Sequence, residues 1–195
     1  MWIVEIYTGT TKKIPEYVVA SLVQKFPGST FWAVNGPYGI YWKGQVPEEE
    51  RESLRHFLNR NRLRKQQWYD EAWDRDTHYR DQFLKNHTGE LRCRYCNRRL
   101  TKRTLEVDHL IPVAQVKKNG RARRRLLRQG IQNVNDIRNL VPSCKRCNRR
   151  KGAKMGVWYL RGKLGKYPIY WKTLFVGKAA AVIAILSVGL YFVLK

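Results

Sequence analysis

The four cysteines restrict the fold of this chain more than any other feature of its sequence. They form two Cys-x-x-Cys pairs, Cys93 with Cys96 and Cys144 with Cys147, and the 47 residues 97–143 lie between the pairs. Four thiolates leave no open coordination position, so the pairs predict a structural, tetrahedral zinc ion that closes a long loop. Residues 1–13, MWIVEIYTGTTKK, lack the apolar core of a signal peptide, so we expect reduced thiols rather than disulfides.

A redox role, or cysteines without any ligand, is the alternative to zinc. Redox chemistry needs only one Cys-x-x-Cys pair, usually within a thioredoxin-like βαβ context, and neither pair has that context in the sequence. Cations flank both pairs, and nearby cations lower the pKa of a thiol and thereby favour metal binding. Structural zinc is therefore the prediction that we carry forward.

The segment LEVDHLIPVAQ, residues 105–115, lies between the two pairs and places an acid beside a histidine. Leu105 and Val107 predict a strand with one buried side, followed by a turn at Asp108 and His109. Adjacent side chains on an extended backbone diverge, so Asp108 could bind Mg²⁺ while His109 serves as a base near neutral pH. Taken alone, the two residues favour a turn cap at Asp108 and a surface histidine at His109 over a catalytic pair.

Four blocks of sequence, in this order, resemble the HNH (ββα-metal) endonuclease family over residues 88–155. They are Cys-x-x-Cys at 93–96, Val-Asp-His-Leu-Ile-Pro at 107–112, Asn-Asp-x-x-Asn-Leu at 135–140, and Cys-x-x-Cys-Asn-x-x-Lys-Gly at 144–152. Each block is a weak signal, but the combination is specific. The resemblance implies two strands and a helix around a catalytic metal, with a structural zinc beneath, in an α+β chain.

The resemblance also implies a role for each site residue. His109 would be the general base that activates water for in-line attack on a phosphodiester. Asp108 and Asn148 would bind one divalent cation, Mg²⁺ or a similar ion. Asn139 would pin the loop that orients His109, and the four cysteines would hold Zn²⁺. Many family members have histidine where this chain has Asn148, but an amide oxygen is still a hard ligand suited to Mg²⁺.

The distribution of charge predicts a polyanionic partner. The chain carries 39 Lys and Arg against 15 Asp and Glu, and residues 88–178 alone hold 25 of these cations against 4 acids. Residues 117–130, KKNGRARRRLLRQG, hold seven cations in fourteen residues and predict a grip on the DNA backbone; the alternative is a solvated, disordered loop. The predicted DNA-binding residues are Lys117, Lys118, Arg121, Arg123, Arg124, Arg125, Arg128, Arg149, Arg150 and Lys151.

The segment 174–194 predicts a transmembrane helix. It is 21 residues long and apolar except for Lys178 and Ser187, and a basic juxtamembrane segment at 157–173 precedes it. The positive-inside tendency predicts a cytoplasmic nuclease domain, a single-pass tail anchor and contact with membrane lipids. A buried core helix, or a hydrophobic tail that mediates assembly of a cytosolic protein, are the alternatives.

Residues 1–46 predict a small α/β domain. We expect a strand over 2–7, a helix over 16–26 opened by Pro15, and strands over 29–34 and 38–44 around a turn at Asn35-Gly36-Pro37. A long polar helix is expected from Pro47, continuing with interruptions to about Asn86, so that residues 47–87 form a helical connector to the HNH domain at 88–156. The tripeptide Gly39-Ile40-Tyr41 matches half of the GIY-YIG nuclease signature, but the other half is missing, so we interpret it as a strand.

Together these observations predict a membrane-anchored HNH endonuclease that hydrolyses DNA with one divalent metal and a histidine base, acting on incoming or phage DNA. The alternative is a non-catalytic, zinc-stabilised protein that tethers nucleic acid to the membrane. Residues 1–87, nearly neutral and rich in aromatic side chains, are expected to bind a protein partner or to set specificity. The sequence does not determine the oligomeric state.

Overall fold

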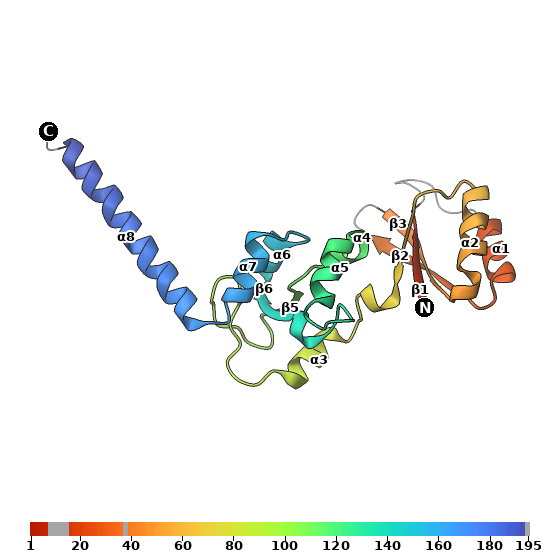
Figure 1. Cartoon of the computed structure of the whole chain (residues 1–195), viewed down its shortest axis with the longest axis horizontal. Coiled ribbons are helices and arrows are strands. Elements are labelled where there is room, and N and C mark those ends of the chain that lie inside the picture. Colours follow the sequence, from red (N-terminus) through yellow and green to blue (C-terminus); the bar gives the residue numbers. More distant parts are fainter. Residues whose placement is uncertain (8–15, 37–38, 194–195) are drawn as a thin grey trace. The chain divides into compact units, whose positions relative to one another are not determined.

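A computed structural model describes residues 1–7, 16–36 and 39–193 of the chain (Figure 1). The chain forms two compact units, each made from two separate stretches of sequence. The first comprises Met1–Asp76 and Val113–Asp136, and the second comprises Thr77–Pro112 and Ile137–Lys195. Residues 113–136, which include the whole basic segment 117–130 and which the sequence assigns to the HNH domain, thus belong to the N-terminal unit.

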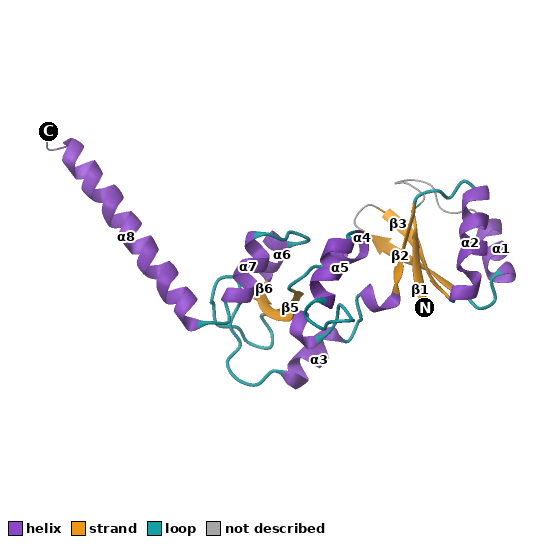
Figure 2. Ribbon diagram, in the orientation of Figure 1, coloured by secondary structure: helices purple, strands orange, loops and turns teal. Residues whose placement is uncertain are grey.

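The first unit contains a four-stranded antiparallel sheet. Its strands are β1 (Trp2–Ile6), β2 (Thr30–Gly36), β3 (Gly39–Val46) and β4 (Gln66–Asp70), in the order β2-β3-β1-β4. Helix α1 (Glu16–Lys25) follows β1, and helix α2 (Glu48–Arg60) follows β3. This β-α-β-β-α-β sequence of elements is a split βαβ arrangement, in which both helices cover one face of the sheet (Figure 2).

Successive side chains of β1 point to opposite faces of the sheet, which explains why the helices pack on one of them. Val4 and Ile6 point to the helix side and are fully buried with Leu22 of α1 and Leu54 and Leu58 of α2. The expected helix and the two aromatic strands are confirmed: β2 and β3 pair from Thr30 with Gln45 to Gly36 with Gly39. The predicted roles of Pro15 and Pro37 fall on residues outside the described structure.

The long polar helix expected from Pro47 is shorter than predicted. It ends at Arg60, and Arg62 adopts a left-handed conformation (φ 61°) that reverses the chain. The residues that follow, QQWYD at 66–70, form β4 and pair with β1 along its whole length. An edge strand placed inside a polar, charge-rich segment carries little hydrophobic periodicity, which is why the sequence pattern did not indicate it.

The segment after the second unit's β5 returns to the first unit as two short helices, α4 (Val113–Lys118) and α5 (Gly120–Leu127). Asn119 caps α5, since its side chain accepts a hydrogen bond from the N–H of Arg121 at 2.8 Å. Val116 and Leu126 are fully buried, so the two helices are packed parts of the unit rather than a disordered loop. The 3₁₀ turn η1 (Glu71–Trp73) lies beside α4.

The second unit is built around an antiparallel strand pair, β5 (Leu105–His109) and β6 (Leu140–Cys144). Their register joins Leu105 to Cys144 and His109 to Leu140. Helix α3 (Tyr79–Asn86) packs against this pair through Phe83. The 3₁₀ turn η2 (Ile137–Asn139) leads into β6, helix α6 (Lys145–Lys151) follows it directly, and α7 (Val157–Leu164) comes next.

The chain ends in α8 (Pro168–Val193), a long helix that extends from the second unit (Figure 1). Its segment Pro168–Ser187 has a mean hydropathy of 1.6 and no buried residue. One C-terminal helix is thus long and apolar enough to span a membrane, and its exposure argues against a buried core helix. The predicted end of the span, Leu194, lies outside the described residues. The mixed α+β composition predicted from the sequence is confirmed.

Candidate functional site

The structure brings the four cysteines together. Their Sγ atoms all lie within 4.8 Å of one another, and the Cys96 and Cys144 sulfurs are 3.9 Å apart. A tetrahedral zinc ion with Zn–S bonds of about 2.3 Å requires sulfur–sulfur distances of about 3.8 Å. All four thiols are free, and the 3.9 Å separation is far longer than a disulfide bond of about 2.05 Å. The predicted cluster can therefore hold a metal ion such as zinc.

Two local structures position these sulfurs. The first pair lies in a tight turn, in which the N–H of Asn97 donates to the Cys93 carbonyl (2.8 Å) and Asn97 adopts φ 61°, a conformation that asparagine tolerates well. The N–H of Arg94 donates to the Pro142 carbonyl at 2.9 Å and so ties this turn to β6. The second pair occupies the junction between β6 and α6, where Cys144 is the N-cap residue.

The thiols differ in acidity in the absence of an ion. Burial raises the pKa of Cys93 to about 11, because a thiolate is poorly solvated there. Burial acts on Cys144 as well, but hydrogen bonds, first from the Cys147 backbone, outweigh it and lower the pKa of that thiol. A bound cation would stabilise all four thiolates, so the site fits a metal better than it fits four neutral thiols.

Asp108 lies on β5 and is buried. Its Oδ2 atom accepts a hydrogen bond from the Tyr95 hydroxyl (2.6 Å) and forms an ion pair with Lys151 Nζ (2.9 Å). Desolvation and the Asp108 carboxylate raise the pKa of Tyr95, so this phenol stays protonated as a donor. Asp108 is thus held by contacts from the first cysteine turn and from the end of α6, rather than capping an open turn.

Lys151 is not placed as the sequence predicted. It is fully buried, and its ammonium also donates to the carbonyl oxygen of His109 at 2.8 Å. A buried, paired ammonium cannot contact a DNA backbone at the surface, so we assign Lys151 to the support of Asp108 and His109. The preceding Arg149 and Arg150, in contrast, are exposed on α6 as expected.

Asn148 contacts a carboxylate that sequence reasoning missed. Its Nδ2 donates to Glu106 Oε2 at 2.7 Å. Glu106 and Asp108 are two residues apart on β5, and their side chains contact Asn148 and Lys151, three residues apart on α6. The signal was present in the sequence, since residues i and i+2 of a strand share a face. Glu106 and Asp108 thus contact α6 through Asn148 and Lys151 respectively.

His109 ends β5 and is only 1% exposed. Its ring lies 4.9 Å from the ring of Tyr79 in α3, measured between centroids, with a tilted geometry. The structure therefore places His109 beside Asp108 as the sequence required, but beneath an aromatic side chain rather than at the open surface. The aromatic neighbour comes from a helix that the sequence had assigned to a connector.

Asn139 is a buried clamp on the segment that follows His109. Its Oδ1 accepts the N–H of Ile111 at 2.9 Å, and its Nδ2 donates to the Ile111 carbonyl at 3.3 Å. The Asn139 backbone carbonyl also accepts the N–H of Leu110 at 2.7 Å. Three hydrogen bonds between Asn139 and the backbone thus fix Leu110 and Ile111, the two residues that follow His109.

The basic segment divides into inward and outward cations. Lys117 does not point outward, as its predicted contact with DNA would require. Its ammonium pairs with Glu5 (2.7 Å) and Asp74 (2.9 Å) inside the first unit. Arg123 is partly buried and donates to the Val116 carbonyl at 2.7 Å. The remaining predicted contacts of this segment are exposed, namely Lys118, Arg121, Arg124, Arg125 and Arg128.

Comparison with known proteins leaves the family of this chain open. No protein-family model, curated protein or solved structure matches it. The resemblance to HNH endonucleases therefore depends on the four sequence blocks and on the contacts described above.

Proposed function

We propose that this chain is a membrane-anchored endonuclease of the HNH type that hydrolyses phosphodiester bonds of DNA. The observation that carries the proposal is the convergence of Asp108, His109 and Asn139 at the end of a strand pair that continues into α6 and adjoins the four-cysteine cluster. Asn139 fixes the backbone beyond His109 with both ends of its amide. A module that only binds DNA has no need of that geometry.

In the proposed reaction His109 accepts a proton from the attacking water. Lys151 donates to the His109 carbonyl and Asn139 holds the following residues, so the backbone that carries the imidazole is fixed on both sides. A divalent cation on the oxygen donors Asp108, Asn148 and Glu106 would neutralise charge on the phosphate. The Lys151 ammonium 2.9 Å from Asp108 opposes such a cation, so we expect tight metal binding only together with the DNA phosphate.

Burial of His109 sets a condition for catalysis. The imidazole is 1% exposed and packs against the Tyr79 ring, so water and phosphate can reach it only if a covering side chain moves. Helix α3 packs mainly through Phe83, and Tyr79 is only partly buried at the start of the helix. We propose that DNA binding displaces Tyr79 and uncovers the base.

A second function is favoured by the same burial. In a non-catalytic, zinc-stabilised DNA-binding protein, Asp108 and Lys151 would form an internal ion pair and His109 would be a core side chain, as their contacts here also permit. The exposed cations of α5 and α6 would serve either function. The two candidates differ in whether DNA is cut.

The test uses the full chain in a nonionic detergent with supercoiled plasmid and Mg²⁺ or Mn²⁺. We expect nicking, and we expect Glu106→Gln to reduce its rate at least about a hundredfold while DNA binding, measured by fluorescence anisotropy, changes little. Asp81→Asn, at an exposed position of α3, is the matched control. DNA binding without nicking by the wild type would support the non-catalytic protein instead.

We further propose that α8 anchors the protein in a membrane with the nuclease on the cytoplasmic side. The length and hydropathy of α8 support the anchor, and the excess of cations before it supports the orientation. Such a protein would meet incoming or phage DNA at the inner face of the membrane. Alkaline carbonate extraction, which leaves a transmembrane protein in the pellet, tests the anchor separately from the chemistry.

A further inference from the structure

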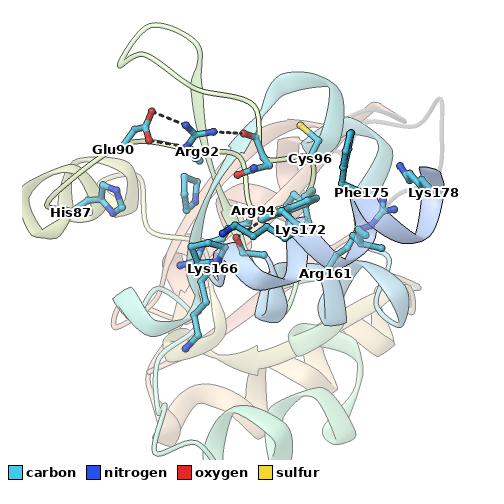
Figure 3. Close-up of a pocket in the computed structure, with 17 residues that line it drawn as sticks. His87, Glu90, Arg92, Arg94, Cys96, Arg161, Lys166, Lys172, Phe175 and Lys178 are labelled. Atoms are coloured by element: carbon cyan, nitrogen blue, oxygen red, sulfur yellow. Dashed lines mark hydrogen bonds and ion pairs between the residues drawn. The ribbon is translucent and has the colours of Figure 1, made fainter. Parts of the chain in front are cut away.

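A pocket lies in the second unit, where the first cysteine turn meets the start of α8. Its volume is about 980 Å³. Figure 3 shows that cations from three segments surround it: Arg92 and Arg94 of the cysteine turn, Arg161 and Lys166 at the end of α7, and Lys172 and Lys178 of α8. None of these residues takes part in the proposed chemistry of Asp108 and His109.

The pocket has far more positive than negative charge. Glu90 is the acid that lines it, and this carboxylate already pairs with Arg92 (2.8 Å) and with Arg99 outside the pocket. Within the described part of the chain, Arg94 and Arg161 have no carboxylate partner. Arg94 is half-buried, so its guanidinium is partly withdrawn from solvent. A half-buried cation without a counter-ion favours an anionic ligand.

The backbone around the pocket is fixed by hydrogen bonds. Arg94 donates its N–H to Pro142 of β6, and Gly165 donates its N–H to the carbonyl of Arg161 at 2.7 Å. A Cβ at Gly165 would lie 2.0 Å from the Arg94 carbonyl oxygen, so the turn between α7 and α8 packs closely on the cysteine turn. The indole of Trp171 donates to the Gly165 carbonyl at 3.0 Å and ties the first turn of α8 to the same place.

One wall of the pocket is apolar and continues into the surface of α8. Leu174 and Phe175 line it, together with Pro168 and Trp171. Phe175 is 75% exposed, and the large apolar side chains that follow it along α8 as far as Leu186 are exposed as well. A ligand that fits this surface has an anionic head and an apolar tail. A nucleic-acid backbone has the charge but offers nothing to the apolar wall.

We propose that this pocket binds the phosphate headgroup of an anionic phospholipid, with its acyl chains along α8. The guanidinium groups of Arg94 and Arg161 bind the phosphate, and Lys172 and Lys178 extend from the helix toward the headgroup layer. The inference rests on the part of the proposed function that places α8 in a membrane, but not on nuclease activity. It gives the second unit a defined position at the membrane surface beyond a simple tail anchor.

The experiment is native mass spectrometry of the full chain in nonionic detergent with added phosphatidylglycerol. The wild type should retain one tightly bound lipid, and Arg94→Gln/Arg161→Gln should weaken that binding at least tenfold. Lys145→Gln/Lys163→Gln removes the same charge from exposed positions of α6 and α7 outside the pocket and should change the affinity less than twofold. Zinc content and circular dichroism verify that each variant is folded.

Three additional ligands separate the sources of the anion. Phosphatidylcholine should bind at least tenfold more weakly than phosphatidylglycerol, and millimolar inorganic phosphate should not displace the lipid. Equal binding of phosphatidylglycerol to the pocket variant and the wild type would overturn the proposal. Displacement by inorganic phosphate or by a short DNA duplex would overturn it too, since either would identify a free-phosphate or nucleic-acid site. If the protein binds the lipid but does not nick DNA, the lipid site stands and only the proposed nuclease activity is contradicted.

Discussion

At the scale of single residues, the centre of the second unit is a buried polar group whose members depend on one another. Asp108 is held by Tyr95 and Lys151, and Lys151 also donates to the His109 carbonyl. The resemblance of four sequence blocks to HNH endonucleases singled out Asp108 and His109, because the Asp-His pair alone favoured a turn cap and a surface histidine. It could not show that Lys151 points inward, since the cationic run Arg149-Arg150-Lys151 gives no indication of which member faces the core.

Removing one partner of the Asp108–Lys151 pair should destabilise the protein strongly. Lys151→Met leaves a buried carboxylate without its counter-ion, and we expect a loss of about 3–5 kcal/mol in the free energy of unfolding. Lys154→Met, at an exposed position nearby, should cost less than about 0.5 kcal/mol. Urea denaturation monitored by circular dichroism measures both changes.

The double variant Asp108→Asn/Lys151→Met separates pairing from burial. If the ion pair is real, the double variant should be less destabilised than the sum of the two single variants by about 1–3 kcal/mol. Strict additivity of the two single changes would show that the side chains do not interact in solution.

At the scale of elements, the strand pair β5–β6 and the cysteine turn form one structural group joined at the four sulfurs. Tyr95 of the turn packs edge-on against Trp158 of α7, with 5.5 Å between ring centroids, and both adjoin the cysteines. The spacing of the cysteines in the sequence was enough to predict that the four sulfurs lie together. The strand β4 and the helices α4 and α5 were not predicted as such, because their positions depend on contacts with distant residues such as Glu5 rather than on local periodicity.

Metal removal should loosen this group selectively. Elemental analysis of the purified protein is expected to give one zinc per chain, and Cys144→Ser or a strong chelator should remove it. Amide hydrogen exchange should then accelerate in residues 92–98 and in β6, whereas β1 and β3 of the first unit should keep their protection. Unchanged exchange around the cysteine turn after complete loss of zinc would contradict a structural role for the ion.

The first unit should lose stability in acid because of its internal carboxylates. Burial alone would raise the pKa of Glu5 and of Asp74. Hydrogen bonds, first from Lys117 to Glu5 and from Lys43 to Asp74, outweigh burial. The pKa of Glu5 is therefore below its ordinary value of 4.5, and that of Asp74 is below its ordinary value of 3.8. Their stabilising contribution is therefore complete above about pH 4.5 and is lost as the pH falls through the lowered values.

Thermal unfolding between pH 7 and pH 3 measures this effect. The melting temperature of the wild type should fall steeply below pH 4.5, and Glu5→Gln, which is less stable at pH 7, should show a shallower decline. Glu52→Gln, at an exposed position of α2, should follow the wild type. A Glu5→Gln profile parallel to that of the wild type would show that Glu5 does not contribute to acid unfolding.

At the scale of the whole molecule, the cations behind the formal charge of +24 occupy different environments. Some cations are internal, as Lys117 and Lys151 show, and others surround the pocket at the start of α8. The exposed arginines of α5 and α6 are the cations that the proposed function assigns to contact with DNA. Composition alone predicted a polyanionic partner, but it could not separate these groups, because burial and pairing are properties of the folded chain.

The central claim is that His109 is the base in a DNA-cutting reaction. The direct test compares single-turnover plasmid nicking by the full-length wild type, His109→Ala and His56→Ala, the last at an exposed position of α2. We expect His109→Ala to lower the rate by about 10²–10⁴-fold with zinc content and DNA binding retained, and His56→Ala to leave it unchanged. Nicking by His109→Ala at the wild-type rate would contradict the proposed function.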